Sequence, residues 1–312
     1  MGISNFRFKT CYRFCLVFPF LNLYLSRLSV TFFMINFNGT ITAAETNLLV
    51  NNRAFLYGDG VFESMKMVDQ KILFLEDHYF RLMASMRIVR MEIPMNFTME
   101  FFEEQILTLA KANNCAESAR VRITVYRNEG GNYLPKQRSV SYLINCTPLE
   151  NKLYSIDSKS YEVDLYKDFY IAKQLLSTLK TTNKILNITA SIYADENGLD
   201  NCLLLNDSKN VAEALQGNIF MVLDGKLITP PLSEGCLNGV MRKQILNLAS
   251  KIEGLEVEEV EISPFDLQKA DELFITNVIK GIQPISKYRK KEFGNPLATK
   301  LVTLLNAQIR LN

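Results

Sequence analysis

The sequence predicts a mixed α/β protein with two domains, and three observations support this prediction. Its 312 residues exceed one average domain. Stretches with strand-like and helix-like patterns alternate along the chain, without repeats or low-complexity tracts. Residues 148–160, which begin at a proline, form the best candidate for a linker between two such halves. We therefore expect a small N-terminal domain over residues 34–150 and a larger C-terminal domain over residues 151–312.

The first 33 residues differ from the rest and are left out of the predicted fold. They carry four basic residues and no acidic residue, and residues 14–25 form an apolar run that Pro19 and Asn22 interrupt. The run is too short to span a bilayer, and no small-residue cleavage site follows it. We expect an N-terminal extension without a role in the function; a targeting segment and an ordered structural segment are the alternatives. The first strand then begins at Met34.

Composition excludes several classes of function. Apolar residues make up 48% of the chain and charged residues 22%, as in ordinary globular proteins. The formal charge is +2, and no basic patch with interleaved aromatic residues stands out, so we expect neither nucleic acid nor a membrane as partner. Six scattered cysteines indicate the reducing cytoplasm rather than a disulfide framework. His78 is the only histidine, and we expect no metal site.

Several elements of the N-terminal half follow from local patterns. Asp69 and Gln70 separate two strand-like stretches, which predicts a hairpin. Helices are expected from about Leu75 and from about Met99 to Ala112. Two strands, 120–126 and 139–145, flank a loop whose Gly-Gly and Pro exclude regular structure.

The C-terminal half combines three predicted helices with short strands. The first helix is expected from Asn183, whose side chain could cap it, the second from Val240 to Lys251, and the third at the C-terminus. The strands are expected at 201–205, 219–223, 226–229, 256–262 and 272–276.

Two charged residues stand in surroundings suited to chemistry. Lys180 lies just before a predicted helix in an apolar, hydroxyl-rich stretch, where desolvation would lower the pKa of its amine. The simpler interpretation is that Lys180 is a surface lysine, and Lys184 is the other candidate for the reactive amine. Glu213 has only apolar neighbours, so its carboxylate needs a cationic partner such as a protonated pyridine nitrogen. The turn before Val240 offers backbone N–H groups that could bind phosphate.

Six segments, in order, resemble the class IV aminotransferases, which depend on pyridoxal 5′-phosphate (PLP). They are YGDGVFES (57–64), LEDHYFRL (75–82), LKTTNKIL (179–186), EALQGNIF (213–220), CLNGVMRK (236–243) and FITNVIKGIQPI (274–285). The resemblance covers nearly everything from Met34 onward. It implies the fold of D-amino acid aminotransferases, with PLP in the cleft between two domains, and a homodimer.

The resemblance also implies roles for individual residues. Lys180 matches the Schiff-base lysine, which also moves the catalytic proton, and Glu213 matches the carboxylate at the pyridine nitrogen. The phosphate ligands implied are Arg81, Val240, Met241, Asn277 and Val278. The implied substrate pocket includes Tyr57, Phe62 and Glu63.

Departures from the family pattern leave two activities open. The chain lacks the Lys-x-Gly-Gly-Asn-Tyr run of branched-chain enzymes and the Arg-x-His motif of D-amino acid enzymes, and Met241 replaces a common threonine. We expect a transaminase that passes the amino group of a small apolar, branched-chain-type L-amino acid to 2-oxoglutarate. The alternative is 4-amino-4-deoxychorismate lyase, which makes 4-aminobenzoate. A non-enzymatic class IV fold would be a colourless protein.

Overall fold

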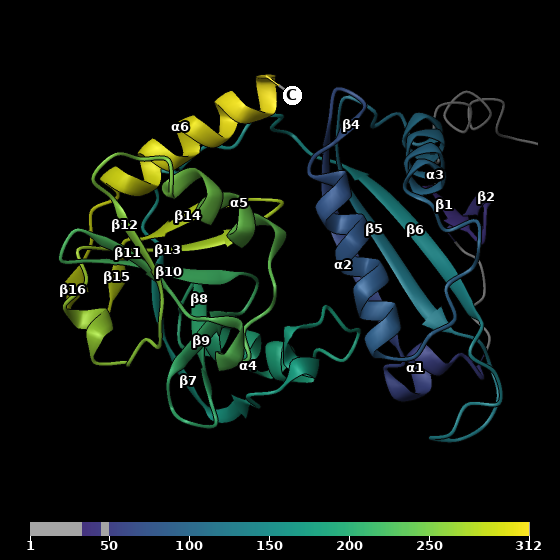
Figure 1. Ribbon diagram of the computed structural model, residues 1–312, viewed down its shortest axis with the longest axis horizontal. Helices are drawn as coiled ribbons and strands as arrows, with labels where there is room; N and C mark the ends of the chain where they lie inside the picture. Colours follow the sequence, from purple (N-terminus) through teal and green to yellow (C-terminus); the bar gives the residue numbers. More distant parts are fainter. Residues whose placement is uncertain (1–32, 45–49, 312) are drawn as a thin grey trace, which may run out of the picture. The chain divides into compact units, whose positions relative to one another are not determined.

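The computed structural model describes residues 33–44 and 50–311, and within them it contains three sheets and six α-helices (Figure 1). The extension predicted over residues 1–33 lies, except for Phe33, outside the described residues. The described residues from Met34 onward form one compact unit. The three sheets and six α-helices confirm the predicted mixed α/β class.

The first sheet contains every described strand up to Pro148. Its six strands follow the order β2-β1-β6-β5-β3-β4, and all neighbours are antiparallel. Their bounds are β1 Met34–Phe37, β2 Thr40–Ala43, β3 Gly60–Val68, β4 Lys71–Ile72, β5 Ser118–Arg127 and β6 Val140–Pro148. The hairpin predicted at Asp69-Gln70 is confirmed, because Met67 on β3 pairs with Ile72 on β4.

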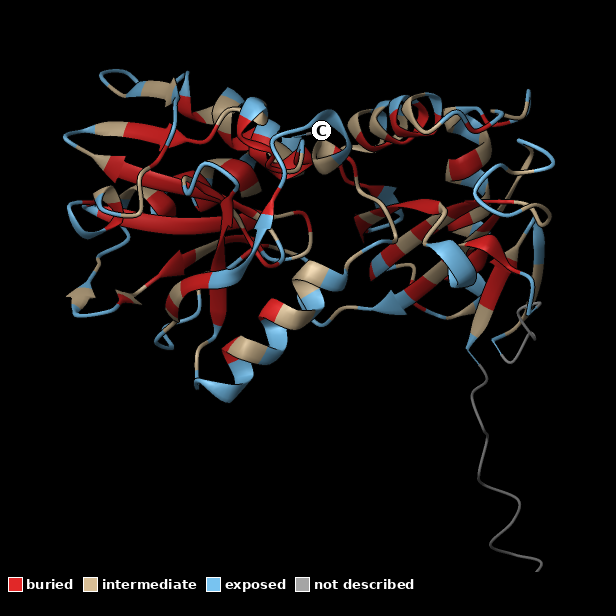
Figure 2. Cartoon of the chain, turned by 90° about the horizontal axis from the view of Figure 1, so that it is seen from below, coloured by how far each residue is buried: buried red, intermediate tan, exposed pale blue. Residues whose placement is uncertain are grey.

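Three helices belong to the same part of the chain: α1 Arg53–Tyr57, α2 Leu75–Ile88 and α3 Met99–Ala112. The helices α2 and α3 pack on the sheet through the buried residues of successive turns, with Leu82, Met86 and Ile106 in one core cluster. Thr98 caps α3 by accepting a hydrogen bond from the Phe101 amide, which explains its sharp start. Figure 2 shows how burial concentrates on the strands and on the inner faces of the helices.

Two five-stranded sheets make up the rest, in the orders β12-β11-β10-β13-β14 and β16-β15-β7-β8-β9. The first comprises β10 Asn218–Leu223, β11 Lys226–Thr229, β12 Glu256–Glu259, β13 Glu272–Asn277 and β14 Gly281–Ile285. The second comprises β7 Glu162–Ile171, β8 Asn201–Asn206, β9 Val211–Ala214, β15 Lys287–Tyr288 and β16 Lys291–Glu292. Apolar side chains from both sheets, such as Leu203, Ile219 and Leu273, share one core cluster.

Three helices accompany these sheets: α4 Ile185–Glu196, α5 Val240–Ala249 and α6 Pro296–Leu311. The helices α5 and α6 lie together beside the β10–β14 sheet (Figure 1), where Ile245 and Leu301 meet Phe274 in one core cluster. The helix predicted from about Asn183 begins at Ile185, and the predicted cap by Asn183 is wrong, since Lys184 is the N-cap and no side chain caps the helix. The preceding residues are held in pairing with β3, where Thr182 donates from its amide to the Gly60 carbonyl, so the helix begins later.

Candidate active site

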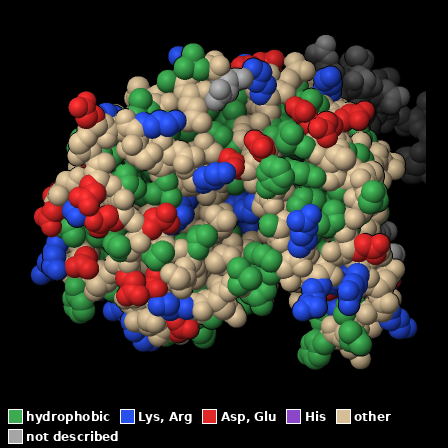
Figure 3. Space-filling model, viewed as in Figure 1, with side chains coloured by type: hydrophobic (Ala, Val, Ile, Leu, Met, Phe, Trp, Pro, Cys, Tyr) green, Lys and Arg blue, Asp and Glu red, His purple; other side chains and the backbone are tan. Residues whose placement is uncertain are grey.

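A cavity of about 750 Å³ lies where the first sheet meets the elements of the C-terminal half. Its walls come from β3, α2, β5, α4, β9, α5 and the end of β13. Six of its lining residues are basic and two are acidic, and Lys and Arg side chains are visible in the middle of the face shown in Figure 3. Eight of the ten predicted site residues line it: Phe62, Arg81, Lys180, Glu213, Val240, Met241, Asn277 and Val278.

Lys180 is held against β3 by its main chain. The Phe62 amide donates to the Lys180 carbonyl at 2.8 Å, and Val61 forms an antiparallel bridge with Thr181. The Lys180 Nζ lies 4.7 Å from the centre of the Phe62 ring. Burial, together with the positive charge of Arg81, lowers the pKa of the Lys180 amine from 10.5 to about 8. A useful fraction of this amine is therefore unprotonated, and nucleophilic, near neutral pH.

Glu213 lies on β9 and pairs with Leu204 of β8. Its Oε2 accepts a hydrogen bond of 2.8 Å from the Leu237 amide. Burial raises the pKa of the Glu213 carboxyl, while this hydrogen bond and the amines of Lys184 and Lys180 oppose the rise. The site thus places a carboxylate that needs a cationic partner opposite two lysine amines.

One end of the cavity is suited to an anion. The helix α5 begins there with Gly239 as N-cap, without a capping side chain and without an acidic residue in its first turn, so its first N–H groups are available. The guanidinium of Arg81 lies at the same place, because its Nη1 donates to the Asn238 carbonyl at 2.8 Å. Thr276, 1% exposed, adds a hydroxyl with no hydrogen-bond partner among the described residues.

The two residues predicted for this region from FITNVIKGIQPI contribute differently. The side-chain oxygen of Asn277 accepts from the amides of Ile279 and Lys280, so it shapes the turn. The Val278 carbonyl accepts a hydrogen bond of 2.6 Å from the Tyr154 hydroxyl. The unpartnered hydroxyl lies on Thr276, directly before them.

Two predicted pocket residues do not line the cavity. Glu63 points from β3 toward α2, where its carboxylate binds Arg81 and His78 and is 2% exposed. Tyr57 is 41% exposed at the end of α1, with its ring 6.0 Å from that of Tyr133. Within this chain, Phe62 alone of the three faces the cavity. Successive side chains of a strand point to opposite faces, so Phe62 and Glu63 could not both do so.

Sequence reasoning missed two arginines of the cavity wall. Arg120 and Arg122 lie two apart on β5 and line the cavity, and among the described residues neither has a carboxylate partner. The Arg122 guanidinium stacks 3.7 Å from the centre of the Phe62 ring and donates to the Thr124 hydroxyl. Their spacing of two in a predicted strand was the available signal.

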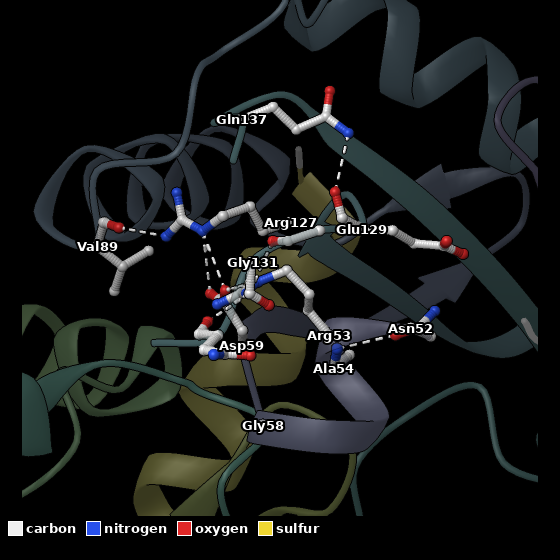
Figure 4. Close-up of polar contacts among 12 residues, drawn as sticks. Asn52, Arg53, Ala54, Gly58, Asp59, Val89, Arg127, Glu129, Gly131 and Gln137 are labelled. Atoms are coloured by element: carbon white, nitrogen blue, oxygen red, sulfur yellow. Dashed lines mark hydrogen bonds and ion pairs between the residues drawn. The ribbon is translucent and has the colours of Figure 1, made fainter. Parts of the chain in front are cut away.

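A second cluster, shown in Figure 4, fixes the loop that follows β5. Asp59 binds the guanidinium groups of Arg53 and Arg127 at 2.8 and 3.0 Å. Arg53 also donates to the carbonyls of Gly130, Gly131 and Asn132, and Arg127 to those of Val89 and Arg90. The predicted Gly-Gly loop is thus anchored through its carbonyl groups.

The described residues contain neither a helix long and apolar enough to cross a membrane nor a cluster of side chains suited to a metal ion. The four described cysteines are free. A half-buried amine of low pKa, a carboxylate opposite it and a cavity end suited to an anion are together compatible with a cofactor that carries an aldehyde and a phosphate.

Comparison with known proteins identifies the family. Residues 60–288 match the family model of the amino-transferase class IV, so the chain belongs to that family of PLP-dependent enzymes. A protein of Methanocaldococcus jannaschii, provisionally named a branched-chain-amino-acid aminotransferase, is 31% identical over 80% of this chain and 86% of its own. The aminodeoxychorismate lyase of Vibrio harveyi is 26% identical over 78% and 88%. D-Alanine aminotransferases of Listeria monocytogenes and two staphylococci also match, at 23–26% identity.

A solved structure is similar over most of its length. The PLP form of the branched-chain amino acid aminotransferase from Thermobaculum terrenum superposes with a TM-score of 0.77 and 26% identity, covering 88% of this chain and 92% of the other. PLP is the cofactor of the family, and the residues present suit it. The orphaned Thr276 hydroxyl, Arg81 and the free start of α5 match its phosphate, and the Lys180 amine matches its aldehyde.

Proposed function

We propose that this chain is a transaminase that transfers the amino group of a small apolar, branched-chain-type L-amino acid to 2-oxoglutarate. The observation that carries the proposal is the half-buried Lys180 amine, whose pKa falls to about 8, facing the same cavity as Glu213. Such an amine can bond to the cofactor aldehyde and, once released, accept and return the proton of the substrate α-carbon. Bound PLP would supply the electron-withdrawing ring that makes this proton acidic.

The other site residues would hold the cofactor in place. Glu213 would stabilise a protonated ring nitrogen. The Leu237 amide anchors its carboxylate, and no charged side chain among the described residues donates a hydrogen bond to it. Arg81, the amides of Val240 and Met241, and the turn at Asn277 and Val278 would hold the phosphate. Thr276 joins this set as a hydroxyl donor.

Arg120 and Arg122 support the choice of acceptor. An apolar amino acid offers one carboxylate, whereas 2-oxoglutarate offers two. These two arginines line the cavity and have no acidic partner among the described residues. They are suited to a second carboxylate, since guanidinium groups bind carboxylates through paired hydrogen bonds. Phe62 and Ile188, which also line the cavity, would contact the apolar side chain of the donor substrate.

A lyase acting on 4-amino-4-deoxychorismate is the second candidate. This substrate also carries two carboxylates, so the same arginines suit it, and the Vibrio harveyi relative bears that name. Both activities need Lys180, and they differ in the bond broken after the substrate amine has bound. The pocket walls, rather than the cofactor residues, would select between them.

We also propose a cytoplasmic homodimer in which residues 34–150 and 151–312 form separate domains. Exposed apolar side chains on α4, among them Ile185, Ile188 and Ile192, support a second copy near the cavity. The first sheet ends at Pro148 and the next strand begins at Glu162, which supports the domain boundary. Light scattering of the purified protein would measure the mass of the assembly.

The deciding experiment is the visible absorbance of the protein loaded with PLP, before and after addition of L-leucine, beside Lys180→Ala. We expect a yellow band that Lys180→Ala lacks and that leucine bleaches, and 2-oxoglutarate should restore it. A band indifferent to leucine and other L-amino acids, with pyruvate released from 4-amino-4-deoxychorismate, would favour the lyase. A protein without any lysine-dependent band would overturn both.

A further inference from the structure

The carboxylate of Glu63 is the centre of a buried cluster between β3 and α2. Its oxygens accept hydrogen bonds from His78 Nδ1 at 2.7 Å, from Arg81 Nε at 2.7 Å and from Arg81 Nη2. The side chains of Glu63 and His78 are 2% and 1% exposed, and that of Arg81 is 10% exposed. Bidentate contact with a buried carboxylate fixes the plane of the Arg81 guanidinium.

The remaining hydrogen bonds of Arg81 aim it at the anion site. Of its five N–H donors, two bind Glu63 and one binds the Asn238 carbonyl at the entrance to α5. Two N–H groups are left over, and the residue lines the cavity beside Gly239 and Val240. The arginine is therefore oriented before any ligand binds, and its two remaining N–H groups can donate to a ligand at the N-terminus of α5.

His78 supports this arrangement from the opposite side of Glu63. The arginine holds the carboxylate ionised, with the pKa of Glu63 at about 2, so Glu63 can only accept hydrogen bonds. His78 must therefore carry a proton on Nδ1. Burial lowers the pKa of His78, which leaves the imidazole neutral, and its Nε2 is buried without a partner. His78 acts as an uncharged, fixed donor rather than as a second cation.

We propose that His78 is a positioning residue which, through Glu63, fixes the orientation of Arg81 for a phosphate group bound at the start of α5. This inference rests on the proposed phosphate site. Without the His78 donor, both oxygens of Glu63 are held by Arg81 alone, and the pair can turn together. The benefit of the cluster is geometric, and it concerns the phosphate end of the cofactor only.

Matched variants separate this role from a merely structural one. Asparagine can place an amide N–H near the position of Nδ1, whereas leucine of similar size cannot donate. Apoprotein affinities for PLP and for pyridoxal, which lacks the phosphate, should be compared by fluorescence titration. We expect His78→Leu to weaken the affinity for PLP about tenfold, by analogy with the loss of a hydrogen-bond partner of a metal ligand, and to leave the affinity for pyridoxal unchanged. His78→Asn should bind PLP within about threefold of the parent.

The outcomes distinguish a failure of the positioning role of His78 from a failure of the proposed phosphate site. Equal weakening of PLP and pyridoxal by His78→Leu, or no weakening of either, would overturn the role of His78. Arg81→Lys is the control for the phosphate site, and it should weaken PLP selectively. If Arg81→Lys spares PLP, the proposed phosphate site itself fails; if it acts selectively while His78→Leu does not, only the positioning role fails.

A measurement on the unaltered protein covers the case in which His78→Leu does not fold. His78 is the only histidine of the chain, so in ¹⁵N-histidine-labelled protein the imidazole signals in NMR come from its two ring nitrogens alone. We expect a neutral ring protonated at Nδ1, whose shift changes when PLP or inorganic phosphate is added and not when pyridoxal is added. A ring protonated at Nε2, or one blind to phosphate, contradicts the proposal.

Discussion

The main-chain amide of Phe62 donates a 2.8 Å hydrogen bond to the carbonyl of Lys180, although 118 positions separate them in the chain. The bond is the middle of a short antiparallel contact, in which the Thr182 amide also donates to the Gly60 carbonyl at 2.9 Å. The reactive amine and the aromatic wall of the cavity are therefore fixed to each other by backbone. Side-chain variants of Phe62 should alter the cavity without moving Lys180.

Removing the Lys180 charge should stabilise the apoprotein. The folded state lowers the pKa of this amine from 10.5 to about 8, so the charged form is penalised on folding. The penalty is fully present below pH 8 and fades as pH rises toward 10.5, where the unfolded chain also loses its proton. Each unit by which the folded and unfolded pKa values differ corresponds to about 1.4 kcal/mol, so Lys180→Met should gain up to about 3 kcal/mol at pH 7. Urea unfolding of the apoprotein measures it, with the exposed Lys300→Met as control; an unchanged midpoint would contradict the low pKa.

Gly217→Ala should distort the floor of the cavity. A Cβ at this position would lie 2.3 Å from the Thr276 carbonyl oxygen, on the neighbouring strand, where backbone must shift. We expect a loss of about 1–3 kcal/mol in the free energy of unfolding, as for other overpacked sites, and weaker PLP binding because Gly217 and Thr276 both line the cavity. At Gly294 a Cβ meets only Pro296, at 3.5 Å, so Gly294→Ala should leave both measurements unchanged. Equal behaviour of the two variants would refute the argument.

Asp59→Asn should destabilise the protein strongly. The substitution leaves Arg53 and Arg127, with side chains 4% and 8% exposed, without their shared carboxylate. Breaking a buried pair from one side costs about 3–5 kcal/mol, because uncompensated charge remains. Thermal and urea unfolding should both detect the loss, and limited proteolysis should cut the loop at Gly130-Gly131 faster. A loss below 1 kcal/mol would mean that the arginines are satisfied by carbonyl groups alone.

Stability should fall in two stages on acidification. The folded pKa of His78 lies below its usual 6.5, so the unfolded chain binds the extra proton first and stability declines as pH falls below that value. The pKa of Glu63 is lowered from 4.5 to about 2, so its contribution is lost as pH falls from 4.5 toward 2. Urea midpoints between pH 8 and pH 3 test this pattern. His78→Asn should flatten the first stage and keep the second; a parent curve flat between pH 6.5 and 5 would be inconsistent with a neutral His78.

Arg120→Leu should impair the acceptor more than the donor. If Arg120 recognises a second carboxylate, KM for 2-oxoglutarate should rise about tenfold or more, consistent with the loss of one charged hydrogen bond of 1.5–3 kcal/mol, while KM for L-leucine changes little. Arg138→Leu removes the same charge from an exposed site outside the cavity and serves as control. Equal effects on both substrates would assign Arg120 a general electrostatic role instead.

The sequence predicted the elements whose patterns are local. The helices α2, α3 and α5 and the hairpin at Asp69 follow from periodicity and turn residues. The strands β7, β9 and β14 were missed, and their signals are weak for physical reasons. In β7 the alternation around Val163 and Leu165 gives way to exposed Phe169 and Tyr170, and β14 contains Pro284, which discourages a strand prediction.

The sequence motifs predicted which residues belong to the candidate site, but not where each side chain points. Lys180, Glu213 and Arg81 come from separate elements and line one cavity, as the family resemblance implied. The direction of each side chain was not available from motifs alone. Glu63, adjacent to Phe62, faces the opposite side of β3, and Arg120 takes its place in the cavity wall only because β5 pairs beside β3.

The paired arrangement of Arg81 and Glu63 also bears on how fast the cofactor can be captured. Because the guanidinium is immobilised without a ligand, its rotational entropy is already lost when the chain folds, and no rearrangement need precede the encounter with phosphate. Association should therefore follow a single exponential whose rate rises linearly with PLP concentration. The slower step would be the bonding of Lys180, and the two could be timed separately by stopped flow.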